Sequence, residues 1–393
     1  MKLAIVASHP VQYYAPLFRT LAQQLDLTVF YAHRDTSEDQ ARAGFGVGFA
    51  WDVDLLSGYS SVFLDNRARH PGLGRFGGVD TPDIGVKLRA GGFGGGFDGV
   101  LVLGWYLKSF IQALVAARRA GIPVMVRGDS QLGTPRSSAK TLLKAALYPL
   151  FLRQFAAALV VGERNRAYWR HYGYPAEQMF SSPHCIDNAW FATRATPAAR
   201  AAVRSRFGLA PDTPVALFAG KLLDFKRPGD FIAGVAAARA GGVPVEAMIA
   251  GSGPLEAQVR AQAHALDVPL HMLGFCNQSE MPGAYAAADV LVLPSTARET
   301  WGLVANEALA CGRPVLLSDA VGSAADLTID ARVGRTFPLG DTGACGNVLG
   351  SMLAQAPGRQ APDRQAIAEI SNRYSLETAA DGVVRALAAI SRR

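Results

Sequence analysis

The stretch DVLVLPSTARETWGLVANEALACGRPVLLS, residues 289–318, joins two apolar segments of strand length through a loop and a short helical segment. Gly302 begins the helical segment, and Gly312 with Pro314 beyond it ends the segment, which is the usual placement of start and stop signals. A strand, a helix and a second strand in this order are typical of a parallel sheet covered by helices. This stretch therefore predicts an α/β fold.

The same alternation continues along the rest of the chain. Upstream, we predict strands at 2–7, 27–31, 99–103, 122–127 and 157–161, and helices at 11–25, 105–120, 137–155 and 163–172. Downstream, we predict strands at 214–220, 243–250, 269–273, 289–293 and 314–318, and helices at 197–208, 228–240, 254–267, 278–287 and 302–311. Two such series predict two doubly wound, Rossmann-like domains that face each other across a cleft.

The periodicity lapses around residues 187–197, so we place the N-terminal domain at 1–190 and the C-terminal domain at 191–374. The final helical pattern, within 375–393, is expected to pack back toward the N-terminal domain. Residues 65–99 are rich in glycine and arginine and are too long for an ordinary connection. We predict that they form a mobile excursion from the N-terminal domain.

The composition of the 393 residues argues against several classes of protein. The 39 lysines and arginines exceed the 32 acidic residues, but they are scattered, which favours anionic small molecules over nucleic acid. The 4 cysteines lie far apart and indicate neither a zinc knuckle nor a disulfide framework. The first apolar run is too short for a secretory signal, and no stretch approaches the ~20 apolar residues of a membrane span. We expect a cytoplasmic protein, with peripheral contact at the inner face of the membrane as the alternative.

Charged residues gather where the downstream strands end, and open parallel sheets bind ligands at that edge. A helix that begins at Gly302 turns free N–H groups and the positive end of its dipole toward the cleft, which favours a phosphate. Glu299 precedes this helix end, and Glu307 lies within the helix. Carboxylates accept hydrogen bonds from hydroxyl groups. The pair therefore suits a nucleotide sugar, which has hydroxyl groups on both sides of a diphosphate.

Two lysines follow the first strand of the downstream series. Lys221 comes directly after Gly220, and Lys226 lies at the start of the next helix, so both ammonium groups can reach one anionic group. Such cations stabilise the charge that develops on a leaving diphosphate without a metal ion. After the second downstream strand, Gly251 and Gly253 allow a tight turn and a close approach of the backbone to a ligand.

These motifs resemble those of the GT4-type retaining glycosyltransferases, which have the GT-B fold. Glu299 and Glu307 match the E-x7-E motif of that family within ETWGLVANEALACGRPV, the two lysines match its basic pair, and GSGPLE matches its glycine turn. The opening SHPVQYYAP with WDVDLLSGY is similar to the opening of one subset of the family. The resemblance covers nearly the whole chain and is strongest between residues 215 and 320.

By this resemblance, the C-terminal domain holds a nucleoside diphosphate sugar, most commonly a UDP-sugar, and the N-terminal domain holds the acceptor. Glu307 would hold the ribose, Glu299 the hydroxyl groups of the transferred sugar, and the two lysines the diphosphate. The donor site is further expected to include Gly220, Gly251, Gly253, Pro294, Gly302, Leu303 and Val304. The acceptor would be a glycan or a lipid-linked molecule used in glycan, polysaccharide or glycolipid synthesis.

The chain departs from the family pattern at the predicted strand PVMVRGDS. Many members have a histidine where this chain has Arg127, Gly128 and Asp129. His9 and Asp129 follow two predicted strands, so either could face the acceptor hydroxyl, and the alternatives are a structural histidine and a capping aspartate. The leaving phosphate can itself take the acceptor proton, so a dedicated base is not required. The predicted catalytic residues are Lys221, Lys226, Glu299, His9 and Asp129.

Two other patterns have simpler explanations. Asp52 and Asp54 match the DxD metal motif of another glycosyltransferase fold, but they lie far from the donor motifs, so we expect no obligatory metal ion and no cofactor besides the substrate. Residues 137–155 combine cations with many large apolar side chains and could lie on an anionic bilayer. Packing against the first sheet, with a kink at Pro149, explains the same residues, and we favour packing.

The leading hypothesis is a metal-independent retaining glycosyltransferase. The glutamates and lysines could instead be surface charges, and the glycines a simple turn. A nucleotide-sugar epimerase of the same fold is the alternative, because it needs no acceptor, and a non-catalytic nucleic-acid-binding protein is less favoured. A dinucleotide oxidoreductase is disfavoured because the first predicted strand is followed by SHPVQYY, which lacks GxGxxG.

Overall fold

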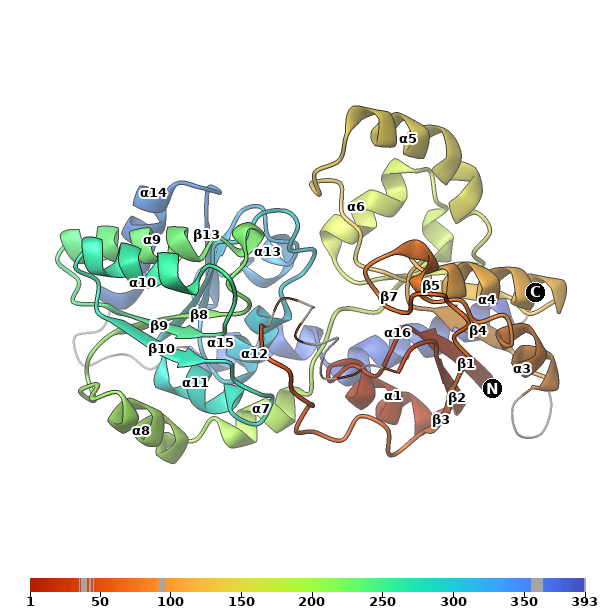
Figure 1. Ribbon diagram of the computed structural model, residues 1–393, viewed down its shortest axis with the longest axis horizontal. Coiled ribbons are helices and arrows are strands. Elements are labelled where there is room, and N and C mark those ends of the chain that lie inside the picture. The colour runs from red at the N-terminus through yellow and green to blue at the C-terminus, as the bar shows by residue number, and fades with distance from the viewer. Residues whose placement is uncertain are drawn as a thin grey trace.

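Short apolar runs form two parallel sheets in the computed structural model, which describes residues 1–34, 36, 41, 44, 46–91, 96–354 and 363–391. The first sheet has the order β3-β2-β1-β4-β5-β6-β7, and the second has the order β10-β9-β8-β11-β12-β13 (Figure 1). The strands of the first sheet are β1 (Lys2–Ala7), β2 (Asp26–Tyr31), β3 (Ser60–Phe63), β4 (Gly99–Val102), β5 (Val124–Arg127), β6 (Ala157–Val160) and β7 (Met179–Ser181). Those of the second are β8 (Val215–Ala219), β9 (Glu246–Ala250), β10 (Leu270–Gly274), β11 (Val290–Leu293), β12 (Val315–Ser318) and β13 (Gly334–Phe337).

Helices connect most of the successive strands and cover both faces of each sheet. In the upstream half they are α1 (Tyr14–Ala22), α3 (Ile84–Ala90), α4 (Lys108–Arg119), α5 (Ser138–Leu152) and α6 (Glu163–His171). In the downstream half they are α7 (Asn188–Arg194), α8 (Pro197–Arg206), α9 (Pro228–Ala240), α10 (Glu256–Ala265), α11 (Met281–Ala287), α12 (Leu303–Ala310), α13 (Ala324–Leu327), α14 (Thr342–Ala354), α15 (Arg364–Arg373) and α16 (Leu376–Ile390). Among the residues described, three short 3₁₀ turns occur, namely η2 (Phe76–Gly78), η3 (Ala176–Gln178) and η4 (Asp224–Lys226).

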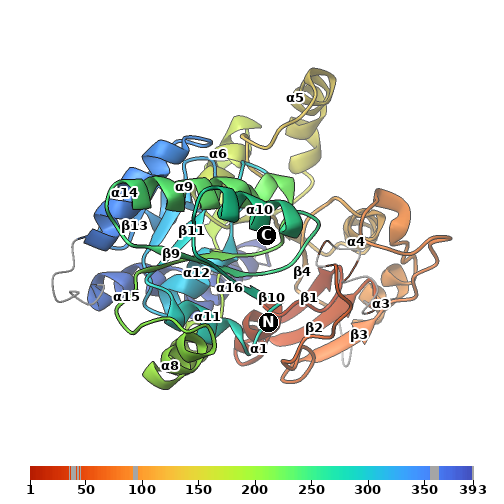
Figure 2. The same cartoon turned by 60° about the vertical axis from the view of Figure 1, so that its left-hand side comes forward.

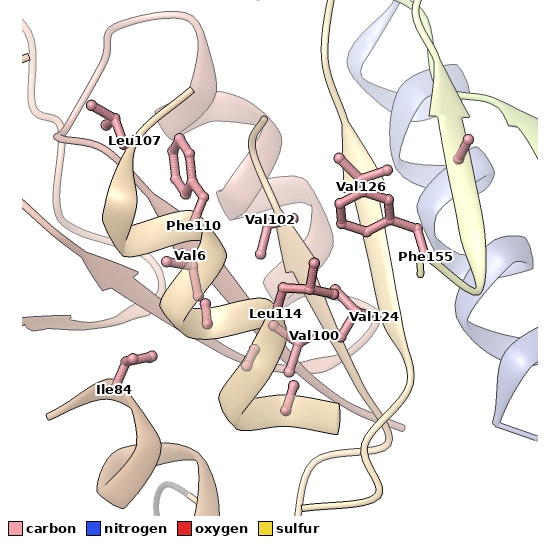
Figure 3. Packing of buried hydrophobic residues seen from close by; sticks show 14 of the residues in the cluster. Val6, Ile84, Val100, Val102, Leu107, Phe110, Leu114, Val124, Val126 and Phe155 are labelled. Atoms are coloured by element: carbon pink, nitrogen blue, oxygen red, sulfur yellow. The ribbon is translucent and has the colours of Figure 1, made fainter. Parts of the chain in front are cut away.

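Successive side chains of β1 point to opposite faces of the first sheet, and both faces are buried. Ala4 and Val6 lie in a core with α3, α4 and α6, whereas Leu3 and Ile5 lie in a core with α1 and α16. Figure 3 shows Val100 of β4 and Val124 of β5 near Leu114 of α4, and Val126 of β5 beside Phe155. The predicted α/β fold with two parallel sheets is confirmed, because nearly continuous apolar strands require helices on both sides.

The strands β3, β7 and β13 are absent from the sequence prediction. Each has at most four residues and lies at an edge of its sheet, where part of the strand is exposed. Such strands lack the long apolar run that marks a buried central strand. Edge position therefore explains why these three were missed.

The predicted mobile excursion at 65–99 is wrong for its central part. This part forms η2 and α3, and α3 buries Ile84 and Leu88 in the first core. The Asp80 carboxylate accepts hydrogen bonds of 2.6 Å from Lys108 and 2.7 Å from Gln112, which ties the segment to α4. Residues 92–95 lie outside the described residues. Two apolar residues in helical register are enough to anchor this glycine-rich stretch.

The favoured packing of residues 137–155 holds for the last turns of α5, where Tyr148 and Phe151 pack against the first core, but not for residues 137–147, which are exposed apart from Lys144. Leu152 is buried in the first core, but Leu142 and Leu150 are 72% and 66% exposed. The helix continues through Pro149. The prediction that this stretch packs against the sheet is therefore wrong for the exposed side chains of α5, such as Leu142 and Leu150.

Helix α16 follows the second domain and packs on the first, against α1, β6 and β7 (Figures 1 and 2). Ser182 Oγ donates to the Ala379 carbonyl at 2.9 Å. Gly382 lets the helix backbone approach β7, because a β-carbon built there would lie 1.8 Å from the Ser181 carbonyl oxygen. The residue at which each domain ends stays a prediction.

We predict that Gly382→Ala destabilises the protein, because the new methyl group would collide with backbone that cannot rotate away. The expected loss is about 1–3 kcal/mol of unfolding free energy, measured by urea denaturation followed by circular dichroism. Gly350→Ala in α14 is the matched control, since its β-carbon would have only an ordinary contact at 3.6 Å. The unfolding free energy of the Gly350→Ala variant should equal that of the unmodified protein or exceed it by up to ~1 kcal/mol. Equal stability of the two variants would contradict the prediction.

Candidate active site

The loops that follow β5 and β11 meet between the two domains. The Thr300 hydroxyl donates to the Asp129 carboxylate. Gln131 Nε2 donates to the carbonyl oxygens of Ala297 at 2.8 Å and Glu299 at 3.2 Å. Asp129 is a predicted acceptor-side residue and Glu299 a predicted donor-side residue. The structure thus brings the two predicted regions into contact.

Lys226 and Glu299 form an ion pair between the loops after β8 and β11. Each side chain is 13% exposed, so the pair is largely removed from water. The Ser295 hydroxyl donates to the same Glu299 oxygen at 3.3 Å. A backbone hydrogen bond of 2.8 Å from Thr296 N to the Phe225 carbonyl joins the two loops. Because a buried charge without its partner is costly, the pair holds both side chains in place.

Lys221 lies close enough to this pair to be affected by its charges. Burial is the main cause that lowers the pKa of Lys221, the charge of Lys226 lowers it further, and Glu299 opposes both. Two cations and one carboxylate therefore form one cluster with a positive excess, which suits an anionic ligand. The sequence predicts two lysines that reach one anion, but their spacing does not reveal the ion pair.

Gly251 and Gly253 pack against the loop that begins at Gly220. A β-carbon built on Gly251 would lie 1.9 Å from the Gly220 carbonyl oxygen, and one built on Gly253 would lie 2.7 Å from the Leu222 carbonyl oxygen. Leu222 N donates to the Ser252 carbonyl at 2.9 Å. The glycines thus allow two backbone segments to pack closely, and their approach to a ligand stays a prediction.

Helix α12 begins next to the loop that carries Glu299. Its N-cap residue is Gly302, whose φ of 93° lies in the left-handed region that favours glycine. Among the described residues, no side chain caps this end. Leu303 and Val304 form the half-buried first turn, and Pro294 is buried directly after β11. The uncapped N–H groups and the helix dipole therefore lie where the sequence predicts a phosphate.

Glu307 lies farther along α12. Its carboxylate accepts a hydrogen bond of 2.6 Å from the Tyr285 hydroxyl of α11. Burial raises the pKa of Glu307 to about 7, although the Tyr285 hydrogen bond opposes the rise. The side chain is therefore divided between acid and carboxylate at neutral pH, and one of its oxygens already has a protein donor.

The N-terminal domain contains a cavity of about 250 Å³ beside the carboxyl ends of β1, β4 and β5. His9 and Asp129, the two predicted acceptor-side residues, both line it. Tyr13, Tyr14 and Tyr106 also line it and supply aromatic rings. A concave site with aromatic walls and a few polar groups is typical of a small-molecule site.

His184 lines the same cavity, and the sequence analysis missed it. Its Nε2 lies 4.0 Å from Asp129 Oδ2, whereas His9 Nδ1 lies 2.9 Å from Ser8 Oγ. Burial, and then the charge of Arg127, lowers the pKa of His184 well below its ordinary value, so the imidazole is neutral. His184 follows β7. The rule that site residues follow strands would have found it if that edge strand had been predicted.

Arg127, one of the three residues that stand where the resemblance leads us to expect a histidine, has a structural role. It is 1% exposed. Its guanidinium donates to the carbonyl oxygens of Ser182 at 3.3 Å and Pro183 at 2.8 Å, and to the Tyr14 hydroxyl at 3.3 Å. These bonds hold the segment that carries His184 against the wall of the cavity.

A second contact between the domains surrounds Asp326 of α13. Glu163 N donates to Asp326 at 3.1 Å, and the Tyr374 hydroxyl donates to the same oxygen at 3.2 Å. Burial raises the pKa of Asp326 to about 6. Nearby, Arg164 donates to the Ala320 carbonyl at 3.0 Å. The start of α6 is thus joined to the C-terminal domain next to the candidate site.

The carboxylates of the DxD pattern have protein partners. Asp52 accepts a hydrogen bond of 3.2 Å from Ser279 N, which links the domains, and Asp54 accepts bonds of 3.0 and 3.1 Å from Leu56 N and Ser57 N within a turn. Within the described ranges, no group of three or more histidine, cysteine, aspartate or glutamate residues could hold a metal ion. A reaction without a metal ion or cofactor stays a prediction.

The match to a known sequence family lies in the downstream half of the chain. Residues 200–369 match the sequence family described as glycosyl transferases group 1. The D-inositol 3-phosphate glycosyltransferase of Xylanimonas cellulosilytica is 32% identical over 249 residues, which are 60% of this chain and 58% of that protein. The phosphatidyl-myo-inositol mannosyltransferase of Mycobacterium leprae is 34% identical over 109 residues, 28% of this chain and 29% of that protein. The chain thus aligns with less than two thirds of either relative.

Solved structures resemble the whole chain. Anabaena Alr3699/HepE in complex with UDP has a TM-score of 0.74 at 18% identity, covering 99% of this chain and 100% of that chain. WaaG, a glycosyltransferase involved in lipopolysaccharide biosynthesis, has a TM-score of 0.62 at 17% identity, covering 96% and 98%. These likenesses confirm the predicted fold. The chain has the GT-B fold, and the sequence of its residues 200–369 matches the family described as glycosyl transferases group 1.

Proposed function

We propose that this protein is a glycosyltransferase that moves a sugar from a nucleoside diphosphate sugar to an acceptor hydroxyl, with retention of the anomeric configuration. The observation that carries the proposal is the cluster of Lys221, Lys226 and Glu299 beside the uncapped start of α12. Cations and helix N–H groups bind a diphosphate, and a carboxylate among them binds sugar hydroxyl groups. The group 1 sequence match over the same residues supports this assignment.

In this proposal the donor lies across the start of α12. The diphosphate contacts the two lysines, the transferred sugar contacts Glu299, and the ribose contacts the oxygen of Glu307 that does not accept from Tyr285. Uridine is the proposed base, because the structurally similar Alr3699/HepE was solved with UDP and with UDP-glucose. The ion pair between Lys226 and Glu299 orders both groups before the donor binds.

The proposed acceptor site is the aromatic cavity of the N-terminal domain. His9, Asp129 and neutral His184 offer hydrogen-bond partners for an acceptor, and Asp129 is bonded to the donor loop through Thr300. A glycan or a lipid-linked sugar is the proposed acceptor class. Relatives that act on inositol phosphate or phosphatidylinositol, by their names, are consistent with a polyol acceptor.

In the proposed reaction, the bond between the anomeric carbon of the donor and the diphosphate oxygen breaks, and a bond from the same carbon to the acceptor oxygen forms on the same face. The acceptor proton passes to the leaving phosphate oxygen, so the products are a glycoside and a nucleoside diphosphate. Lys221 and Lys226 would stabilise the charge that accumulates on the leaving group. The protein needs to supply orientation and positive charge, and the described cluster offers both.

We predict that a thermal-shift panel of nucleotides and nucleotide sugars identifies UDP and one UDP-sugar as stabilising ligands. A ligand at 100 times its Kd adds about 2.7 kcal/mol of stability. The chosen donor is then incubated with enzyme alone and followed by NMR. An unchanged or slowly hydrolysed sugar supports the transferase, whereas an epimerised sugar supports the epimerase. No stabilisation by any nucleotide sugar would contradict both.

Replacement of Lys226 by Met should slow donor turnover about 10²-fold, because the leaving diphosphate loses one stabilising cation. Release of nucleoside diphosphate from the donor is the measurement, and thermal unfolding is recorded in parallel because Glu299 loses its partner. Lys87→Met, at an exposed position in α3, is the control and should retain full turnover. Normal turnover in a folded Lys226→Met protein would reject the proposed role.

Donor affinity should rise about tenfold between pH 6 and pH 8, because Glu307, with a pKa of about 7, becomes a carboxylate that accepts ribose hydrogen bonds. Calorimetric titration with the nucleotide sugar, whose phosphates stay ionised, measures this change. The dependence should vanish in Glu307→Gln and persist in Asp326→Asn. Because the pKa of Glu307 is raised from its ordinary value of 4.5 to about 7 in the folded protein, protonated Glu307 stabilises the fold. This stabilisation is lost as the pH rises from 4.5 through 7. A pH profile unaffected by Glu307→Gln would refute the assignment.

A further inference from the structure

Helix α5 exposes four leucines that form one patch, called here the α5 leucine patch: Leu142, Leu143, Leu147 and Leu150 are 72%, 60%, 54% and 66% exposed. Single exposed leucines are ordinary, but four on one helix are not, and a contiguous apolar surface marks an interaction site. Burying such a side chain removes apolar surface from water, which is favourable. Water alone is therefore an unfavourable environment for this face.

The opposite side of α5 holds the helix in one orientation. Tyr148 and Phe151 pack against the first core, and Leu152 is buried within it. Trp105 Nε1 donates to the Tyr148 hydroxyl at 3.2 Å. The exposed fractions of the four leucines show that the α5 leucine patch is turned toward solvent while this packing occupies the inner side. Figures 1 and 2 show α5 projecting from the first domain, with its outer side away from both sheets.

Apolar side chains thus occur on both sides of α5. A helix that is apolar all round is normally buried or in contact with a membrane. The helix has 15 residues, about 22 Å in length, which is shorter than the ~30 Å hydrocarbon core of a bilayer. In the part of the chain that the structure describes, no helix meets the length and hydropathy needed to cross a membrane. A helix that lies along the surface fits these dimensions.

Positive charge surrounds the α5 leucine patch. Residues 130–162 contain Arg136, Lys140, Lys144 and Arg153 and no aspartate or glutamate. Lys140 and Arg153 are exposed. Lys144 lies on the inner side, where its ammonium is 4.5 Å from the centre of the Tyr148 ring. Cations in a stretch without carboxylates, next to exposed leucines, match the polar and apolar parts of an anionic lipid surface.

We propose that α5 docks this protein onto the surface of an anionic membrane. The α5 leucine patch enters the boundary between head groups and acyl chains, and Lys140 and Arg153 contact lipid phosphates. A second copy of the chain fits less well, because a two-fold interface would place the same patch against itself. Cations would then face cations with no carboxylate from this stretch to pair them.

The docking surface is connected to the candidate site. The loop from Asp129 to Ser137 leads directly into α5, and its Gln131 is bonded to the Glu299 loop. Trp105, which is bonded to α5, also lines the acceptor cavity. If the proposed transfer reaction holds, docking places the acceptor cavity beside the lipid layer, and the acceptor is lipid-borne. The docking itself does not rest on that reaction.

Co-sedimentation of the full chain with vesicles tests the proposal. The protein should bind vesicles of phosphatidylcholine mixed with phosphatidylglycerol and bind pure phosphatidylcholine vesicles at least about tenfold more weakly, with binding reduced by salt. The double variant Leu142→Ser/Leu150→Ser should lose at least about tenfold in affinity. Lys140→Glu/Arg153→Glu should lose affinity only for the anionic vesicles.

Val86→Ser is the matched control, because Val86 is 60% exposed on α3 of the same domain but lies outside the α5 leucine patch. It should bind vesicles like the unmodified protein. All variants should keep the same thermal unfolding midpoint and donor turnover, so a failure of docking is distinguishable from a failure of the proposed reaction. Absence of vesicle binding, or equal binding by the leucine double variant, would overturn the proposal. A dimer that the leucine variant dissociates would assign the patch to a second copy instead.

Discussion

The loop at residues 294–302 is bonded to both domains, and the geometry of the candidate site depends on it. Within its own domain, Thr296 N donates to the Phe225 carbonyl, and Gly322 N donates to the Glu299 carbonyl. On the other side, Gln131 donates to two of its carbonyl oxygens. A backbone held at these points has little freedom to move. The ion pair with Lys226 and the contact with Asp129 follow from that restraint.

Much of the fold could be predicted from the sequence, because central strands of a parallel sheet are nearly continuous apolar runs and their helices have regular spacing. β8, β11 and β12 lie within the segments predicted for them. Edge strands such as β7 could not be predicted, since they are short and partly exposed. Helix α3 was hidden in a stretch rich in glycine, where only its buried leucine and isoleucine reveal it.

For the site, the sequence indicates which residues gather at the strand ends, but not how they pair. The E-x7-E spacing predicts that Glu299 and Glu307 flank the start of a helix, as they do. It does not predict that Lys226 pairs with Glu299, or that Tyr285 contacts Glu307 from a neighbouring helix. His184 was missed because its position depends on an edge strand. Contacts between segments that are distant in the sequence decide which site residues form ion pairs and which are protonated. No local sequence pattern reveals such contacts.

The return of α16 to the first sheet means that the chain passes between the domains twice, once before Asn188 and once near Ser375. The two passages lie together, because Asn188 Nδ2 donates to the Ser371 carbonyl at 3.0 Å and both border a cavity of about 500 Å³. The upstream half is therefore not encoded by one uninterrupted stretch, because α16 completes it from the far end of the sequence. A gene fragment that stops at residue 190 would lack α16, so the face of the first sheet that α1 and α16 cover together would be partly exposed. Two adjacent covalent tethers also restrict any opening of the molecule to rotation about the line that joins them.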